Sequence, residues 1–135
     1  GGDMADNEQQ LRKLIELTNQ HDVEAIQGLL ADDMRFTNPI TGASDREGMR
    51  NIHSTIFKAF PDINYGVDRI IVSGNTYVME CTLTGTHQND LMGVPPTNKR
   101  IELPAAFVVD MSDGKVANWN SYFDVATLMR QLGVE

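Results

Sequence analysis

The chain has 135 residues, of which 41% are hydrophobic and 22% are charged, and this size and composition fit one globular domain. A domain of this length buries roughly two-thirds of the surface of its unfolded chain, so we expect folding to need neither a metal nor a disulfide. The formal net charge of -8 has the wrong sign for a phosphate backbone or an anionic lipid surface. We therefore expect neither nucleic acid nor a membrane as a partner.

The start of the chain and its cysteine content indicate the extent of the domain and its compartment. The two opening glycines look like an expression-tag remnant, so we interpret residues 1–3 as that remnant or a disordered start, and residues 4–135 as one domain. Cys81 is the single cysteine, which excludes an internal disulfide. No charged and then apolar leader precedes the first expected helix, and no apolar run approaches the roughly 20 residues of a membrane span. A soluble, cytoplasmic protein is expected.

The chain opens with two segments of helical spacing. From Asp6, apolar residues recur every three or four positions and polar residues fill the gaps, which predicts an amphipathic helix. Asp22 can cap a second, shorter helix, whose apolar stripe covers residues 23–30. Apolar and polar residues then alternate over residues 34–38, which predicts a short strand before a turn at residues 40–43.

A third helix is predicted between this turn and Phe60. Ser44 and Glu47 have the spacing of a capping box at its start, and Pro61 follows its end. Apolar side chains and His53 recur at helical spacing, so they lie on one side of the helix. We expect this side to pack against the rest of the domain.

Beyond the third helix the pattern changes to the period of two that is typical of strands. Four segments have it: 63–73, 76–86, 100–110 and 115–123. Short glycine-containing turns join the first to the second and the third to the fourth, as in hairpins. Residues 88–99 contain Gly93 and two prolines and are expected to form a long loop, while residues 125–132 are expected to form a helix that Gly133 ends.

Helices followed by a run of strands predict an α+β domain. We expect a cone-shaped α+β barrel, in which the N-terminal helices pack on one face of a strongly curved antiparallel sheet. Such a cone encloses an apolar pocket with a few polar groups, which is the usual form of a small-molecule site. No motif has the spacing of metal ligands, a phosphate-binding loop or a nucleophile elbow. We therefore expect no metal and no cofactor, and either cofactor-free chemistry or binding alone.

A series of short motifs runs through the second half of the chain. They are Phe60-Pro61-Asp62, Gly85-Thr86-His87-Gln88, Met92-Gly93-Val94-Pro95-Pro96-Thr97, Asp113-Gly114-Lys115-Val116, Trp119, Asp124 and Gln131-Leu132-Gly133. Together they resemble the SnoaL-like polyketide cyclase or ester cyclase family, within the superfamily of the nuclear transport factor 2 fold. The resemblance covers nearly the whole chain, from about the first helix to the C-terminus.

This resemblance implies a cone-shaped α+β barrel, often a dimer packed through the outer face of the sheet. For a true cyclase it implies an intramolecular aldol closure without metal or organic cofactor, with an acid/base aspartate directly after a tryptophan on the last strand. In this chain Asn120 follows Trp119, and an amide cannot accept a proton at neutral pH. The fold also hosts isomerases, hydrolases and proteins without any chemistry, so it does not by itself define a reaction.

His87 and Asp124 are predicted to be the catalytic pair. His87 ends a strand on which alternate residues are apolar, so an unbroken register turns its ring toward the pocket, where it can polarise a carbonyl or pass a proton. Asp124 shares a strand face with Asn120 and Tyr122 and can replace the missing base. Each has a structural alternative: His87 is bonded to the neighbouring loop, or Asp124 caps the last helix.

Further residues are predicted to bind the substrate. They are Asn38, His53, Asn120, Tyr122, Phe107, Trp119 and Met92. The structural alternative is a turn before Pro39 for Asn38, and a satisfied core histidine for His53. The aromatic residues are equally compatible with the core, and Met92 is interpreted as a lid residue.

The sequence thus predicts a SnoaL-like protein that binds a small, largely apolar carbonyl compound in the cone, as a cofactor-free acid/base enzyme of cyclase, isomerase or lyase type. The alternative is a non-catalytic module that binds a small ligand or serves a partner protein. A homodimer is expected in either case, because Ala106 and Val108 share the sheet face that the helices leave uncovered.

Overall fold

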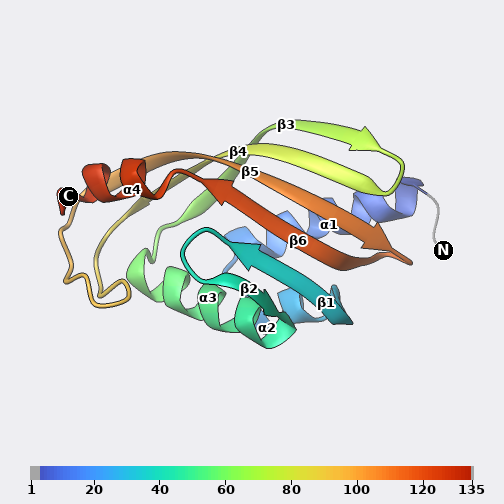
Figure 1. Cartoon of the computed structure of the whole chain (residues 1–135), viewed down its shortest axis with the longest axis horizontal. Coiled ribbons are helices and arrows are strands. Elements are labelled where there is room, and N and C mark those ends of the chain that lie inside the picture. Colours follow the sequence, from blue (N-terminus) through green and yellow to red (C-terminus); the bar gives the residue numbers. More distant parts are fainter. Residues whose placement is uncertain (1–3, 135) are drawn as a thin grey trace.

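A computed structural model describes the backbone of residues 4–134 and the side chains of residues 6–134, so the prediction for residues 1–3 lies outside the described residues. The elements in chain order are α1 (Met4–Asn19), α2 (Val23–Gln27), β1 (Leu30–Asn38), β2 (Gly42–Asp45), α3 (Arg46–Ala59), β3 (Asn64–Ser73), β4 (Thr76–Thr86), β5 (Arg100–Ser112), β6 (Lys115–Phe123) and α4 (Val125–Leu132) (Figure 1). None of the described helices is long and apolar enough to cross a membrane.

One curved sheet of six strands forms the body of the molecule, in the order β2-β1-β6-β5-β4-β3. This confirms the α+β fold, with helices packed on a strongly curved sheet. The prediction of a wholly antiparallel sheet is wrong at one pairing, because β1 and β6 run parallel, with Phe36 opposite Trp119. A hairpin cannot join parallel strands, and here the chain between them passes through α3 and the four other strands of the sheet. The sheet is open, since β2 and β3 are its two edges.

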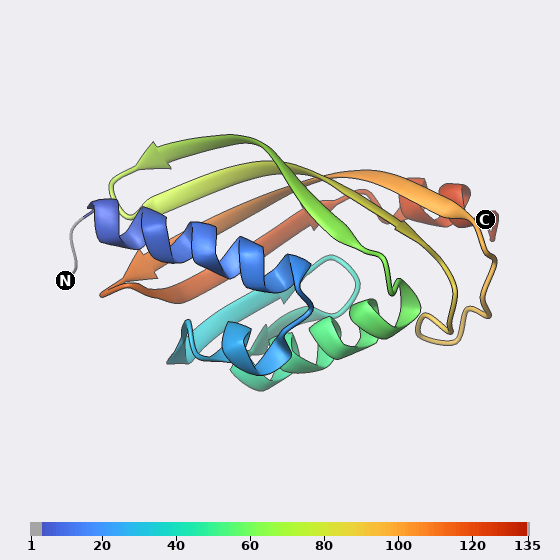
Figure 2. The ribbon, with the colours of Figure 1, turned by 180° about the vertical axis from the view of Figure 1, so that it is seen from behind.

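Helices α1, α2 and α3 lie on one face of the sheet, and α4 lies beside one end of it (Figures 1 and 2). α1 contacts β3 and β6, while α3 contacts β1 and β2. The strands place alternate side chains in the core between these layers: in β4, Tyr77, Met79, Cys81 and Leu83 are all buried, and the residues between them are half-buried. The core therefore fills the concave side of the sheet.

The first half of the chain departs from the sequence prediction in its details. α2 ends at Gln27, and Leu30 already belongs to β1. The predicted turn at residues 40–43 contains the start of the short strand β2. α3 is capped by Asp45 instead of Ser44, because the Asp45 carboxylate accepts a hydrogen bond from the Gly48 N–H at 3.0 Å.

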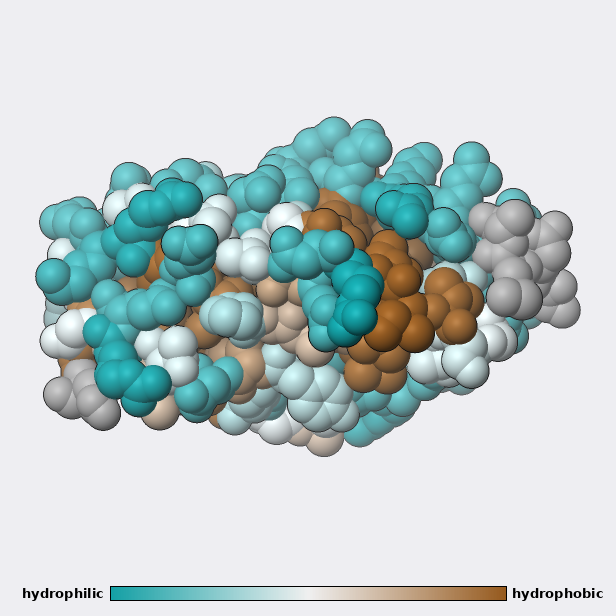
Figure 3. All heavy atoms as spheres, turned by 90° about the horizontal axis from the view of Figure 1, so that it is seen from above, coloured by the Kyte–Doolittle hydropathy of each residue, from teal (hydrophilic) through white to brown (hydrophobic). Residues whose placement is uncertain are grey.

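The outer face of the sheet has no helix over it within the described chain. The side chains of Ile71 in β3 and of Tyr122 in β6 are exposed there, since they lie opposite Val78 and Ala106 on the face that points away from the core. Seen from above, a hydrophobic area lies among hydrophilic side chains on the part of the surface that β3 borders (Figure 3). Exposed apolar side chains on an uncovered sheet face are the usual mark of a contact surface.

Candidate functional site

Two adjoining chambers lie inside the cone, between α3 and the concave face of the sheet. The polar chamber, of about 40 Å³, is lined by Phe36, Asn38, Met49, Ile52, His53, Ile56, Tyr65, Leu83, Phe107, Trp119, Ser121 and Phe123. The apolar chamber, of about 50 Å³, is lined by Asn38, Ile40, Ile52, Ile56, Phe60, Ile63, Leu83, Leu91, Met92, Ile101, Leu103, Phe123 and Leu128. As they stand, the chambers have room for a few water molecules, so a larger ligand must displace side chains.

His53 is the most unusual group in the walls of the polar chamber. It is 5% exposed, and its Nδ1 is buried without a hydrogen-bond partner. Its ring stacks on Phe57 with 5.3 Å between centroids, and His21 stacks on the same phenylalanine at 4.3 Å. Burial lowers the pKa of His53 to about 4, so the ring is neutral at pH 7. A neutral imidazole has one N–H and one lone pair, and it can therefore donate to a ligand oxygen.

Three further polar side chains of this chamber offer hydrogen-bond donors. The Asn38 side-chain carbonyl accepts from the Ile40 N–H at 2.8 Å, which leaves its NH₂ group for a ligand. Ser121 Oγ accepts from Trp119 Nε1 at 3.1 Å, which leaves its hydroxyl hydrogen. Burial raises the pKa of the Tyr65 phenol, so it stays protonated. Together with His53, these groups favour a ligand atom that accepts hydrogen bonds.

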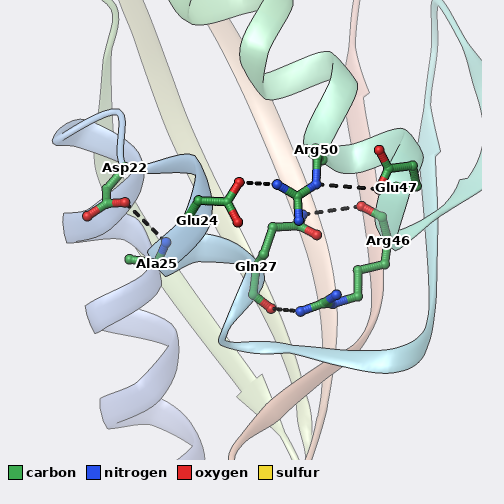
Figure 4. Close-up of polar contacts among 7 residues, drawn as sticks. All are labelled: Asp22, Glu24, Ala25, Gln27, Arg46, Glu47 and Arg50. Carbon is green, nitrogen blue, oxygen red and sulfur yellow. Dashed lines mark hydrogen bonds and ion pairs between the residues drawn. The ribbon is translucent and has the colours of Figure 1, made fainter.

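The start of α3 is fixed by polar contacts with α2 (Figure 4). Arg46 donates from Nη2 to the Gln27 backbone carbonyl at 2.7 Å, and the Gln27 side-chain amide donates to the Arg46 carbonyl at 3.2 Å. Arg50 pairs with Glu47 at 3.4 Å and also with Glu24. These contacts hold the first turns of the helix, and the helix then carries its histidine to the chamber wall about two turns further on.

His87 is fully buried but lines neither chamber. Its Nδ1 accepts from the Thr97 N–H at 3.2 Å and lies 3.0 Å from the Thr97 hydroxyl oxygen. Its backbone N–H donates to the Lys99 carbonyl at 2.9 Å, and its carbonyl accepts from the Asn98 N–H at 2.8 Å. Nε2 is buried without a partner beside the ring of Phe60. These contacts tie the end of β4 to the far end of the loop between β4 and β5. His87 is therefore bonded to the neighbouring loop, as the structural alternative for this residue predicted.

Asp124 lies at the surface, at the start of α4. Its carboxylate accepts from the Thr127 hydroxyl at 2.7 Å and from the Ala126 N–H at 3.2 Å. The hydrogen bond from Thr127 is the main cause that lowers the pKa of this carboxyl. The residue therefore caps the helix, and the structure does not bring it together with His87 in the chambers. Catalysis by His87 and Asp124 stays a prediction. The separate positions of the two residues do not favour it.

The faces of β6 decide which of its residues can reach a ligand. Ser121, which shares a face of β6 with Trp119, lines the polar chamber. Asn120 lines neither chamber and bonds to the side chain of Thr37, while Tyr122 is 56% exposed on the outer face. The placement of Asn120 and Tyr122 on the pocket side is therefore wrong. Their shared face was expected correctly, but the pleat turns it toward solvent.

The remaining predicted substrate-binding residues do line the chambers: Asn38, His53, Phe107, Trp119 and Met92. Sequence reasoning missed Ser121 and Tyr65. Ser121 shares strand parity with Trp119, so the signal for it was present in the alternation of β6. Within the described chain, no three His, Cys, Asp or Glu residues are grouped so that they could hold a metal ion.

A strongly curved mixed sheet, with helices on its concave side and an apolar cavity between the layers, defines a cone-shaped α+β fold that binds small molecules. The family model of the SnoaL-like polyketide cyclases matches residues 8–132, and the chain belongs to this family. No curated protein matches the chain significantly in sequence.

Solved structures with the same fold include three from Streptomyces species. IdmH from Streptomyces antibioticus, a candidate polyketide cyclase, is 28% identical, and the match covers 95% of this chain and 99% of that chain with a TM-score of 0.83. TsrD from Streptomyces laurentii is 24% identical over 100% of both chains, with a TM-score of 0.86. AclR from Streptomyces galilaeus, a candidate hydroxylase, is 24% identical over 98% of this chain and 88% of that chain, with a TM-score of 0.87.

Proposed function

We propose that the protein binds a small, largely apolar carbonyl compound inside the cone and polarises its carbonyl oxygen, as an acid/base enzyme of cyclase, isomerase or lyase type. The observation that carries this proposal is the neutral, buried ring of His53, which lines the polar chamber and whose Nδ1 has no hydrogen-bond partner in the described chain. A buried polar group without a partner costs free energy, and a ligand oxygen that bonds to the ring removes this cost.

The donors around His53 favour a carbonyl oxygen over other ligand groups. Asn38, Ser121 and Tyr65 each have a donor to offer in the same chamber. A carbonyl oxygen has two lone pairs and can accept from two of these donors at once. Inside the protein, away from bulk water, such hydrogen bonds are stronger than in water.

Polarisation of a carbonyl leads directly to chemistry at the neighbouring carbon. Donors aimed at the oxygen stabilise the negative charge that develops there when a water molecule in the chamber takes a proton from the carbon next to the carbonyl. Loss of this proton is the first step shared by isomerisation, aldol closure and elimination next to a carbonyl. Removal of one well-placed donor typically reduces such a step about a hundredfold or more.

Proton exchange at a ketone tests this function without knowledge of the natural substrate. The protein is incubated with 2-heptanone in D₂O, and loss of the hydrogens next to the carbonyl is followed by NMR. We expect exchange above the buffer rate for the wild type and the loss of this excess in His53→Leu. His21→Leu, a change at the far end of the same ring stack, should retain it. Equal exchange in wild type and His53→Leu would contradict a role for His53.

A second candidate function is binding without turnover. It is favoured by the absence of any aspartate or glutamate from the walls of either chamber in the described chain, which leaves no carboxylate base next to the ligand. A protein of this kind shows saturable binding of the ketone and exchange at the buffer rate only. The same NMR samples therefore distinguish the two functions.

We also propose that the protein is a homodimer that associates through the outer face of the sheet. Ala106 and Tyr122 are cross-strand partners on this face and border a hollow there. Val108 has the same parity in β5. A sheet with one uncovered face that exposes aromatic and apolar groups is well suited to pack against a second copy.

A further inference from the structure

The two chambers differ sharply in what they offer a ligand. The side chains of His53, Tyr65 and Ser121 line the polar chamber alone. In the apolar chamber Asn38, which lines both, is the one residue with a polar side chain. Since the chambers share part of their walls, a single molecule that reaches from one to the other meets donors at one end and hydrocarbon at the other.

Neither chamber has a charged wall. No lysine, arginine, aspartate or glutamate of the described chain lines either of them, although the chain as a whole carries a net charge of -8. Transfer of a carboxylate or an ammonium group into such a space, away from any opposite charge, is strongly unfavourable. The walls therefore select against charged ligands.

The apolar chamber is closed by the tip of the loop between β4 and β5. Leu91 is buried in its wall, while Met92 lines the same chamber and is 46% exposed. The backbone of Leu91 and Val94 exchanges two hydrogen bonds of 2.9 Å, which makes the tip a tight turn. Met92 has an unbranched, flexible side chain at the surface, so it can move outward when a ligand enters.

We propose that one uncharged, elongated ligand spans both chambers, with its hydrogen-bond acceptor beside His53 and Asn38 and its apolar end beneath Leu91 and Met92. The identity of the acceptor as a carbonyl rests on the proposed function. The length, the orientation and the neutrality of the ligand rest on the walls of the two chambers. A ligand of this kind gains affinity with each methylene group until the apolar chamber is full.

Methionine residues in the two chambers allow a direct test. Met49 lines the polar chamber alone and Met92 the apolar chamber, while Met111 is buried in the core and lines neither. Protein labelled with ¹³C at the methionine methyl groups is titrated by NMR with methyl ketones from acetone to 2-nonanone. Each signal is assigned by a methionine-to-leucine variant.

We expect acetone to shift the Met49 signal alone, and longer ketones to shift Met49 and Met92 together while Met111 stays in place. Affinity should rise about fourfold per methylene group. Hexanoate and hexylammonium should shift neither signal at about ten times the ketone concentration. Ketones that bind no more tightly than these two ions would overturn the neutrality of the ligand. A Met92 signal that responds to acetone before Met49 would overturn its orientation.

Ligand length is tested separately by filling the apolar chamber. Met92→Trp should weaken the binding of 2-nonanone more than tenfold and leave the binding of acetone unaffected, because the indole occupies the space of the ligand tail. Ile71→Trp, at an equally exposed position on the outer face, is the matched control and should change neither affinity. Equal affinity of 2-nonanone for wild type and Met92→Trp would overturn the spanning arrangement. If no ketone shifts any methionine signal, the proposed function fails together with this inference.

Discussion

At the scale of single residues, the main feature of the cavity is a buried ring nitrogen that has no hydrogen-bond partner. Most buried polar groups in proteins have hydrogen-bond partners, so each exception calls for an explanation. His53 and His87 both have a buried ring nitrogen without a partner. His53 lies in a cavity wall, where a ligand can satisfy it, whereas the other ring nitrogen of His87 is already bonded to Thr97. This difference makes His53 the better candidate for contact with a ligand.

Burial of His53 should make the stability of the fold depend on pH. The unfolded chain protonates this histidine near its ordinary pKa of 6.5, but the folded chain does so only at about 4. Between these values the unfolded state binds more protons, so stability falls as pH falls. We expect the free energy of unfolding to drop by about 2 kcal/mol from pH 7.5 to pH 5. Urea unfolding of wild type and His53→Gln measures this, and an equal drop in both would contradict it.

At the scale of elements, the loop between β4 and β5 depends on His87 for its anchorage. The side chain accepts a hydrogen bond from Thr97, and the backbone bonds to the two residues that follow Thr97. Asn98 has a positive φ of 60°, a conformation that asparagine tolerates better than most residues. The loop is thus held at its end, while its tip closes the apolar chamber.

Removal of the His87 acceptor should loosen this end of the loop. We expect His87→Leu to lower the free energy of unfolding by about 1 to 3 kcal/mol, because the Thr97 N–H loses its partner and the buried ring is replaced. Amide hydrogen exchange at Thr97 and Asn98 should become faster. His87→Asn, which retains an acceptor close to the ring position, should restore part of the protection. Unchanged exchange in His87→Leu would show that the ring does not anchor the loop.

The cap of α4 gives a second expectation for an element. Asp124→Ala should lower the thermal midpoint by a few degrees, because the Ala126 N–H and the Thr127 hydroxyl lose their acceptor. Asp124→Asn retains a capping oxygen and should be milder. Both variants should bind 2-heptanone as the wild type does. Loss of binding in Asp124→Asn, with its midpoint unchanged, would instead favour a role in the site.

The sequence allowed the later elements to be predicted better than the earlier ones, for physical reasons. In β4 and β6 the period of two is long and glycine turns mark the ends, so both strands have the predicted bounds. β2 has four residues without any alternation of burial, and it exists because its backbone pairs with β1. Such pairing depends on contacts distant in sequence, as does the parallel pairing of β1 with β6.

The same limit applies to the site. Alternation showed that Trp119 and Ser121 share one face of β6, but not which face the helices would cover. His53 could be assigned to the buried stripe of its helix, since helical spacing is local. Its missing partner could not be predicted, because this depends on which side chains from five strands line the chamber with it.

At the scale of the whole molecule, the sheet separates two surfaces with different roles. The concave side holds the chambers and the helices that cover them, and the outer side exposes Tyr122 and Ile71. Association through the outer side leaves the chamber walls untouched. Binding and dimerisation should therefore be separable by substitution.

Ala106→Glu should convert the dimer into a monomer, because it places a charge at the centre of the proposed contact. Gln20→Glu adds the same charge at an exposed position at the end of α1 and is the matched control. Analytical ultracentrifugation at micromolar concentration measures both. A wild type that sediments as a monomer would contradict the dimer, and so would an Ala106→Glu variant that remains dimeric.

The central claim is that His53 donates a hydrogen bond to the carbonyl oxygen of a ligand inside the cone. The infrared stretching band of ¹³C-carbonyl-labelled 2-heptanone measures this bond directly, since a hydrogen bond lowers the frequency of the band. We expect the bound ketone to absorb at lower frequency in wild type than in His53→Leu, with His21→Leu indistinguishable from wild type. The same frequency for the ketone bound to wild type and to His53→Leu would contradict the claim.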